Sequence, residues 1–331
     1  MKRYIPSTMT LHLNPHRLSS YIVNTRSKSV DSSSSASQNS GAIPLGSDIT
    51  PVQMSYASFE YTTPNKDSKN PPVILMHGLL GSKGNWNSIS KNIHAMTNRK
   101  IVTADARNHG DSPHTPEFSY NHMAVDLRIL MEELGIKKAT LIGHSMGGRT
   151  VMFFAHTYPE MVDKLIVVEI SPISVSPAFT RVSQLLGQMA GIDLEPNVPL
   201  FGARKLVNDV LSKHVPDEGV RNYLLTNLVE REFGKYKWRF NLNAISRHFQ
   251  NLISFPTFGG SFNKPTLFIG GANSENIKTS EHIDIRKIFP KAKFVSIENA
   301  GHFPHFEQPK EFIETVSIFI QRNQTRKLPF G

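Results

Sequence analysis

The feature that most constrains the fold is an alternation, after about residue 52, of short apolar runs with longer segments of helical periodicity. This alternation is typical of parallel strands joined by crossover helices. Several runs consist of Val, Ile and Leu, as expected of strands buried on both faces of a sheet. The runs predict strands at residues 55–62, 73–76, 101–104, 139–142, 165–168, 266–269 and 293–297. The longer segments predict helices at residues 86–96, 120–134, 146–157 and 309–321. We therefore expect an α/β fold whose mostly parallel central sheet is flanked by helices.

One long segment interrupts this pattern. Between Pro172 and Pro265 the strand signal disappears, and apolar residues recur at helical spacing at Leu242, Ile245, Phe249, Leu252 and Ile253. We expect an all-helical lid at residues 172–256, inserted into a core formed by residues 51–171 and 257–322. The apolar face of the lid either lines a channel for an acyl chain or packs the lid onto the core. The second interpretation is favoured, because an apolar stripe on a helix most often serves packing.

The net charge of +10 is carried mainly by the two ends of the chain. The first 30 residues hold five Lys or Arg and no acid, and residues 321–331 hold three bases and no acid. Residues 51–320 have 29 basic against 25 acidic residues, a net charge of only +4. A nearly neutral body argues against nucleic-acid binding, which needs a clustered basic surface.

The first 50 residues have the composition of a targeting segment. They contain Arg and many hydroxyl residues, and they run into a Ser-rich stretch that cannot bury apolar surface. The apolar run at residues 21–23 is too short for a secretory signal, so the composition favours a mitochondrial transit peptide over an ordinary disordered tail. We expect a disordered leader at residues 1–50, a mitochondrial, matrix location and a basic tail at residues 323–331. No apolar run is long enough for a transmembrane segment.

The strongest chemical signal is the G-x-S-x-G pattern at residues 143–147, between a predicted strand and a predicted helix. This context is that of a nucleophile elbow, in which glycines permit a sharp turn that exposes the serine hydroxyl. We therefore expect Ser145 to be a nucleophile. The chain has no cysteine, which excludes a thiol nucleophile, thiolate zinc sites and disulfides.

The same residues resemble a phosphate-binding P-loop, since residues 143–150 read G-x-x-x-x-G-R-T. Arg149 occupies the position of the required lysine, and arginine does not replace that compact point charge conservatively. A nucleotide site is therefore disfavoured. No spacing of His, Asp and Glu indicates a metal, and no cofactor is expected.

Two backbone amides are candidates for the oxyanion hole. A His-Gly pair follows the buried strand at residues 73–76, so the next loop can direct the N–H of Leu79 at a developing oxyanion. The second donor would be the N–H of Met146, the residue after the nucleophile. His77 and His144 are expected to support these turns structurally.

A serine hydroxyl needs a general base, and His302 follows the last predicted strand, in the chain order serine, acid, histidine. His305, three residues on, is expected to be a surface residue. Two carboxylates compete to orient His302. Glu169 ends an apolar strand, where an unpaired charge is costly, and Glu275 lies in the loop after residues 266–269. Glu169 is favoured, with Glu275 as the alternative acid.

These residues make the chain similar to the α/β-hydrolase superfamily over about residues 52–320. More narrowly, it resembles a family of mitochondrial α/β-hydrolase domain-containing proteins, with yeast relatives and small bacterial esterases. The narrower resemblance is carried by residues 77–83 (HGLLGSK), 105–112 (DARNHGDS), 143–148 (GHSMGG), 170–172 (ISP) and 224–230 (LLTNLVE). It implies an α/β-hydrolase fold and a mitochondrial serine lipase or esterase that acts on diacylglycerol-type glycerolipids. It also implies an association with the 2-oxoglutarate dehydrogenase complex.

Two positions depart from the family pattern. The relatives carry aspartate where this chain has Glu169, so an extra methylene must be accommodated. Asn243 stands where some relatives carry an aspartate that has been proposed as the triad acid, and an asparagine cannot ionise.

The residues thus predict a serine ester hydrolase that forms an acyl-enzyme. Two alternatives stay open: an alcohol acyltransferase using the same acyl-enzyme, and a non-catalytic scaffold for a matrix enzyme complex.

Overall fold

A computed structural model describes residues 21–26, 49–61, 70–175, 178–192, 198–232, 234–256, 258 and 260–322. Its centre is an eight-stranded sheet in the order β1-β2-β4-β3-β5-β6-β9-β10. The strands from β4 to β10 pair in parallel, and β1 and β2 add two antiparallel pairings at one edge. The strands are β1 (Tyr21–Arg26), β2 (Tyr56–Tyr61), β3 (Val73–Met76), β4 (Ile101–Ala104), β5 (Ala139–His144), β6 (Val162–Val168), β9 (Thr266–Gly271) and β10 (Ala292–Ile297). The predicted mostly parallel sheet is confirmed.

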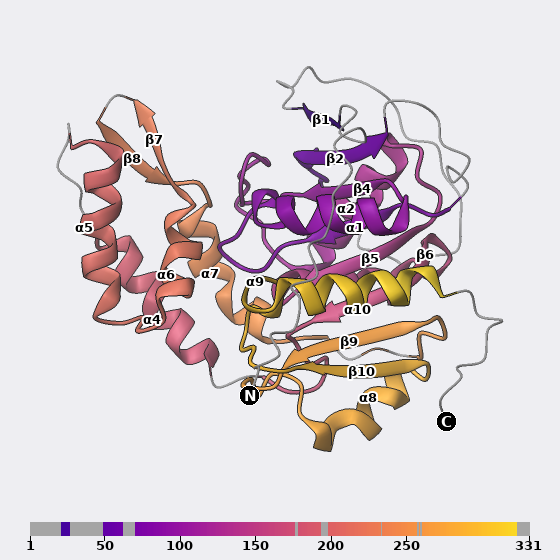
Figure 1. The fold of residues 1–331 in the computed structure, drawn as a ribbon. Coiled ribbons are helices and arrows are strands. Elements are labelled where there is room, and N and C mark those ends of the chain that lie inside the picture. The colour runs from indigo at the N-terminus through magenta and orange to yellow at the C-terminus, as the bar shows by residue number, and fades with distance from the viewer. Residues whose placement is uncertain are drawn as a thin grey trace, which may run out of the picture.

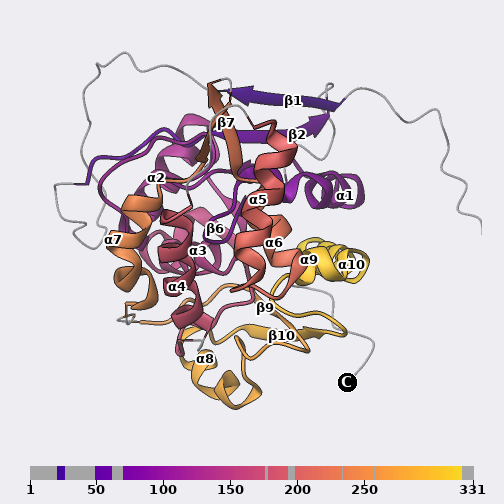
Figure 2. The ribbon, with the colours of Figure 1, turned by 90° about the vertical axis from the view of Figure 1, so that its left-hand side faces the viewer.

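Helices cover both faces of the sheet, as Figures 1 and 2 show. Side chains alternate along each strand, so Val73 and Leu75 of β3 enter one apolar layer while Ile74 and Met76 enter the other. The first layer packs against α1 (Asn87–Thr97) and α10 (Pro309–Gln321). The second packs against α2 (Tyr120–Glu133), α3 (Met146–Thr157) and α8 (His282–Ile288). All seven predicted strands and four predicted helices occur, with ends displaced by at most three residues.

The lid lies between β6 and β9 and stands beside the core in Figure 1. It contains the helices α4 (Ala178–Ala190), α5 (Leu200–Ser212), α6 (Glu218–Leu225) and α7 (Leu242–Ile253). It also contains an antiparallel hairpin, β7 (Leu228–Glu232) and β8 (Lys235–Trp238), so the expectation of an all-helical insertion was wrong. Ile245, Phe249 and Leu252 of α7 are buried in the same apolar cluster as the core, which supports their interpretation as packing residues.

Strand β1 lies inside the segment that was expected to be a disordered leader. Its register pairs Tyr21 with Tyr61 and Arg26 with Tyr56, so these six residues extend the sheet and the expectation of disorder was wrong for them. Residues 1–20, 27–48 and the basic tail at residues 323–331 lie outside the described part of the chain. Within the described part, no helix is both long and apolar enough to cross a membrane.

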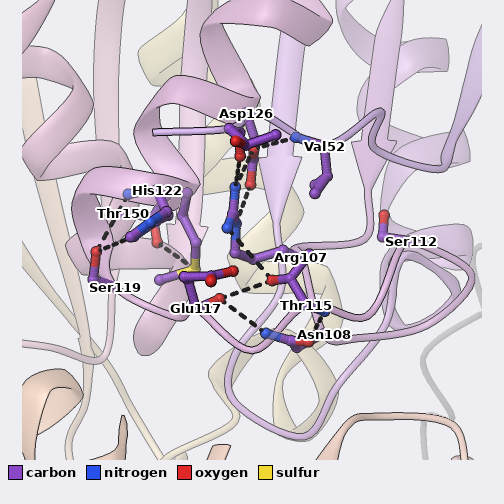
Figure 3. A network of polar contacts seen from close by, with 12 residues as sticks. Val52, Arg107, Asn108, Ser112, Thr115, Glu117, Ser119, His122, Asp126 and Thr150 are labelled. Carbon is purple, nitrogen blue, oxygen red and sulfur yellow. Dashed lines mark hydrogen bonds and ion pairs between the residues drawn. The ribbon is translucent and has the colours of Figure 1, made fainter. Parts of the chain in front are cut away.

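A buried ion pair between Arg107 and Asp126 fixes the loop of residues 105–112, as Figure 3 shows. Nε and Nη2 of Arg107 each donate to the carboxylate of Asp126 in α2 at 2.7 Å. The backbone amide of Val52 donates to the same carboxylate. Arg107 also donates to the carbonyl of Thr50. The pair therefore joins the start of the described core, α2 and this loop. Removing one partner would leave a buried charge uncompensated.

Candidate active site

The carboxyl ends of four neighbouring strands bring the predicted site residues to one edge of the sheet. In the strand register, Met76 of β3 lies beside Gly143 of β5, and His144 lies beside Val168 of β6. Val168 in turn lies beside Ile269 of β9. The loops that follow these strands carry Leu79, Ser145 and Glu169, and open parallel sheets bind ligands at this edge.

Ser145 occupies a strained turn between β5 and α3. Its φ is 51° and its ψ is −114°, a conformation that L-residues rarely adopt. Its N–H donates to the carbonyl of Val168 at 2.9 Å, which ties the turn to β6. The side chain is partly exposed, while His144 and Met146 on either side are buried. This is the exposed serine of a strand-turn-helix elbow.

The glycines of the motif are required by close backbone contacts. A Cβ on Gly147 would lie 2.5 Å from the carbonyl oxygen of Met76, and one on Gly143 would lie 2.2 Å from the carbonyl oxygen of Gly147. A Cβ on Gly148 would lie 2.6 Å from Ile170. The helix therefore approaches β3 and β5 so closely that no side chain fits.

Two backbone N–H groups that follow β3 and β5 are candidates for contact with a ligand. Met146 is the first residue of α3, where an N–H has no intrahelical acceptor, and the N-terminal end of the helix dipole favours negative charge. Among the described residues, neither Met146 nor Leu79 donates its backbone N–H in a turn, loop or cap hydrogen bond. The oxyanion hole of Leu79 and Met146 therefore stays a prediction.

His302 is held on two sides. Its Nδ1 lies 3.2 Å from Glu169 Oε2, and its carbonyl accepts a hydrogen bond of 2.8 Å from His144 Nε2. The rings of His144 and His302 lie 4.8 Å apart between centroids. A proton on Nδ1, shared with the carboxylate, leaves Nε2 unprotonated. Among the described residues no hydrogen bond joins the Ser145 hydroxyl to this imidazole, and apo sites often tighten such contacts only when substrate binds.

Glu169 is fully buried and has a positive φ of 58°. Oε1 accepts from the amide of Gly271 at 2.6 Å, and Oε2 accepts from Ser274 Oγ at 2.6 Å and Asn276 Nδ2 at 2.8 Å. Burial raises the pKa of this carboxyl, but the hydrogen bonds from His302, Asn276 and Ser274 lower it more, so the pKa lies below its usual range. The longer side chain is accommodated because the loop after β9 wraps around both oxygens.

The structure separates Glu169 from the other acid candidates. Glu275 is exposed. Asn243 of α7 is also exposed and lines a cavity of 460 Å³ between α4 and α7. Only Glu169 among the three has a contact with His302 in the described structure.

The other histidines near the site are bound to backbone. His77 donates from Nδ1 to the carbonyl of Gly78 and accepts at Nε2 from the amide of Ala106. Burial lowers the pKa of both His77 and His144, which keeps the rings neutral. His305 is buried and stacks on Trp86 with centroids 4.5 Å apart, so the expectation of a surface residue was wrong.

Sequence reasoning missed Ser274 and Asn276, which hold the carboxylate. Asn276 Nδ2 also lies 2.9 Å from His302 Nδ1, so one amide contacts both members of the acid and histidine pair. In the sequence of this loop, Glu275 stood out as the carboxylate. The signal for the other two residues was a pair of short polar side chains in the loop that follows the strand next to β6.

Comparisons with known proteins agree with this geometry. The alpha/beta hydrolase fold family matches residues 71–309. The sn-1-specific diacylglycerol lipase ABHD11 of Mus musculus is 39% identical over 273 residues, which cover 82% of this chain and 87% of that protein. A marine microorganism esterase of known structure superposes with a TM-score of 0.74 at 33% identity, covering 81% of this chain and 99% of that one. Ethanol acetyltransferase 1 of Eremothecium cymbalariae is 29% identical, covering 76% of this chain and 74% of that protein.

Proposed function

Because the chain belongs to the α/β-hydrolase fold family and is a carboxylic-ester hydrolase, we propose that it cleaves glycerolipid esters of the diacylglycerol type through an acyl-enzyme on Ser145. The mouse relative, which is named a diacylglycerol lipase, supports the substrate class. The observation that carries the mechanism is the hydrogen-bonded pair of His302 and buried Glu169 beside the strained turn of Ser145.

In the proposed mechanism, the Ser145 hydroxyl attacks the ester carbonyl while His302 takes its proton at Nε2. The N–H groups of Leu79 and Met146 donate to the oxyanion of the tetrahedral intermediate. His302 then protonates the leaving alkoxide, and water releases the acid by the reverse steps. Glu169 stabilises the imidazolium, and its lowered pKa keeps it ionised near neutral pH.

The test is hydrolysis of a p-nitrophenyl ester and of a diacylglycerol by the purified protein and by Ser145→Ala. We expect the variant to lose several orders of magnitude in kcat. Labelling of wild-type protein, and not of the variant, by a fluorophosphonate probe would locate the nucleophile. Equal hydrolysis by both proteins would refute the mechanism, and folded wild-type protein that neither hydrolyses esters nor reacts with the probe would favour the scaffold alternative.

Acyl transfer to an alcohol is a second candidate, supported by the similarity to an ethanol acetyltransferase. It uses the same acyl-enzyme, with an alcohol in place of water. Product analysis in the presence of ethanol separates the two, because transfer yields an ethyl ester and hydrolysis yields a free acid.

Mitochondrial matrix location and association with the 2-oxoglutarate dehydrogenase complex stay predictions from the sequence. The location is supported by the acid-free composition of the first 30 residues. Fusing residues 1–50 to a fluorescent reporter tests it: mitochondrial fluorescence is expected, and a diffuse signal would contradict the prediction. Co-purification of the complex with the full chain from mitochondria tests the association.

A further inference from the structure

The loop of residues 78–83, which we call the oxyanion loop, carries the Leu79 N–H and is held by contacts from both the core and the lid. Leu80 has a φ of 60°, which costs a non-glycine residue free energy. The core holds one side of the loop: His109 Nε2 accepts from the amide of Leu80 at 3.1 Å, and Asp105 accepts from the amide of Lys83 at 2.6 Å. These contacts fix N–H groups and leave the carbonyls of the loop to other partners.

Two donor side chains of the lid contact three successive carbonyls of this loop. The Tyr223 hydroxyl of α6 lies 3.2 Å from the carbonyl oxygens of both Gly78 and Leu79. Asn227 Nδ2 donates to the carbonyl of Leu80 at 2.8 Å. Tyr223 is buried and Asn227 is completely so. Asn227 belongs to the LLTNLVE segment at residues 224–230, and Tyr223 directly precedes it.

Peptide geometry links the first of these carbonyls, that of Gly78, directly to the predicted oxyanion hole, and the other two belong to the next two peptide units of the loop. The Gly78 carbonyl and the Leu79 N–H belong to one planar trans peptide unit, so they point in opposite directions. A donor that holds the carbonyl therefore also directs the N–H. The Gly78 carbonyl has two further donors within its own segment, His77 Nδ1 and the amide of Gly81. For the carbonyls of Leu79 and Leu80, the hydrogen bonds found in the described residues come from the lid.

Two further features indicate that these contacts are built into the chain. A Cβ on Gly81 would lie 2.0 Å from the Tyr223 hydroxyl, so glycine at this position makes room for the lid residue. Asn227 Oδ1 is buried without a hydrogen-bond partner in the described structure, which costs stability. An apolar residue would avoid that cost but would lose the contact with Leu80.

We propose that Tyr223 and Asn227 are positioning residues that hold the oxyanion loop, so that the lid takes part in transition-state stabilisation besides covering the site. The proposal rests on the proposed function, because it requires that the Leu79 N–H stabilise an oxyanion. Burial raises the pKa of the Tyr223 hydroxyl, so it remains a protonated donor across the working pH range.

The test uses Tyr223→Phe and Asn227→Leu in the full chain, with Tyr236→Phe as the matched control. Tyr236 is also a lid tyrosine, and its hydroxyl donates to the carbonyl of Val198 away from the oxyanion loop. For each protein we would measure kcat, KM, thermal stability and the inhibition constant of a trifluoromethyl ketone carrying the substrate's acyl chain. That inhibitor forms an oxyanion on the serine.

Removal of one whole oxyanion donor lowers kcat by about a hundredfold to a thousandfold. We expect a smaller or similar effect here, a fall in kcat of about tenfold to a hundredfold in both test variants. KM should change by less than about twofold, and the inhibition constant should rise in parallel with the loss in kcat. Asn227→Leu should keep the melting temperature of the wild type, because two effects offset each other. The variant stabilises the fold by removing the unpaired Oδ1 and destabilises it by leaving the Leu80 carbonyl without its donor. Tyr236→Phe should match wild type in kcat, KM and inhibition constant.

A purely structural role predicts a different pattern. Wild-type kcat and inhibitor affinity in both test variants would overturn the proposal, as would a loss of kcat with unchanged inhibitor affinity. If Tyr223→Phe does not fold, Asn227→Leu decides by the same criteria. Failure of the proposed function is recognised separately: wild type and Ser145→Ala would then hydrolyse the ester equally, and both proposals would fall.

Discussion

His305 should make the protein lose stability in mild acid. Its ring is buried against Trp86, and its Nδ1 has no hydrogen-bond partner in the described structure. Burial, and then the charge of His302, lower the pKa of His305 from 6.5 to about 3. Between these values the unfolded chain binds a proton that the folded chain does not. Stability from the neutral ring is therefore complete above pH 6.5 and is lost as the pH falls toward 3.

The size of the effect follows from the difference in the number of protons bound by the unfolded and the folded chain. One proton contributes about 1.4 kcal/mol per pH unit to the free energy of unfolding. From pH 6.5 to pH 5 this one histidine thus removes about 2 kcal/mol. His305→Phe keeps an aromatic ring against Trp86 and has no nitrogen to leave unpaired. We expect the variant to be at least as stable as wild type at pH 8, and to gain about 2 kcal/mol relative to wild type at pH 5.

Urea unfolding at pH 8, 6.5 and 5, followed by tryptophan fluorescence, measures this difference. The chain has two tryptophans, and Trp86 contacts the ring of residue 305. The fluorescence therefore reports on the surroundings of the substituted residue. Buried histidines that do not contact residue 305 titrate in both proteins and cancel in the comparison. The ring of His144 lies 4.7 Å from that of His305, but burial is the main cause of its lowered pKa and is kept in the variant. Parallel pH dependence in wild type and His305→Phe would refute the reasoning, since it would mean that residue 305 takes up no proton on unfolding.

Three further predictions concern the site and the lid. Glu169→Gln should lower kcat by about three to four orders of magnitude, because the amide cannot stabilise the imidazolium, while Glu275→Gln should retain wild-type turnover in the same steady-state assay. Gly147→Ala places a Cβ against two backbone carbonyls and should cost about 2–4 kcal/mol of unfolding free energy, measured in urea; an unchanged midpoint would contradict the close packing of α3. Arg149 donates to the carbonyls of Leu252, Ile253 and Ser174, where the lid leaves the core, so Arg149→Lys should cost about 1–3 kcal/mol and speed limited proteolysis at these junctions. Unaltered cleavage there would contradict this assignment.

The core was predictable because its signal is local. A strand such as β3 is buried on both faces, so an uninterrupted run of Val, Ile, Leu and Met marks it in the sequence. The elbow was predictable because a helix that packs on β3 with no room for a Cβ requires glycine at fixed positions around Ser145. Glu169 directly follows β6, and His302 lies in the loop after β10. Both strands pair in parallel with β9, so these two loops leave the sheet at the same edge.

The features that the sequence did not predict lack a local signal of this kind. The strands β7 and β8 are largely exposed and carry charged residues, such as Glu230 opposite Tyr236, so no apolar run marks them. His305 is buried because the short helix α9 (Pro304–Glu307) packs over Trp86, a contact that spans more than 200 residues of sequence. Asn276 and Tyr223 act through hydrogen bonds to residues that are distant in the sequence, and such contacts leave no periodic pattern.

The strained backbone residues of the site are stabilised by two separate parts of the structure, the sheet and the lid. Ser145 and Glu169 both have positive φ, and both are tied to the sheet, through the carbonyls of Val168 and Ile269 that accept their N–H groups. Leu80 has positive φ as well, but its amide is held by His109 and its carbonyl by Asn227 of the lid. Each such residue costs about 1–3 kcal/mol, which the surrounding contacts must offset. A displacement of the lid therefore removes support from the oxyanion loop and leaves the nucleophile and the acid in place. The backbone of Ser145 and of Glu169 is held by the sheet, whereas the position of the Leu79 N–H depends on the lid as well.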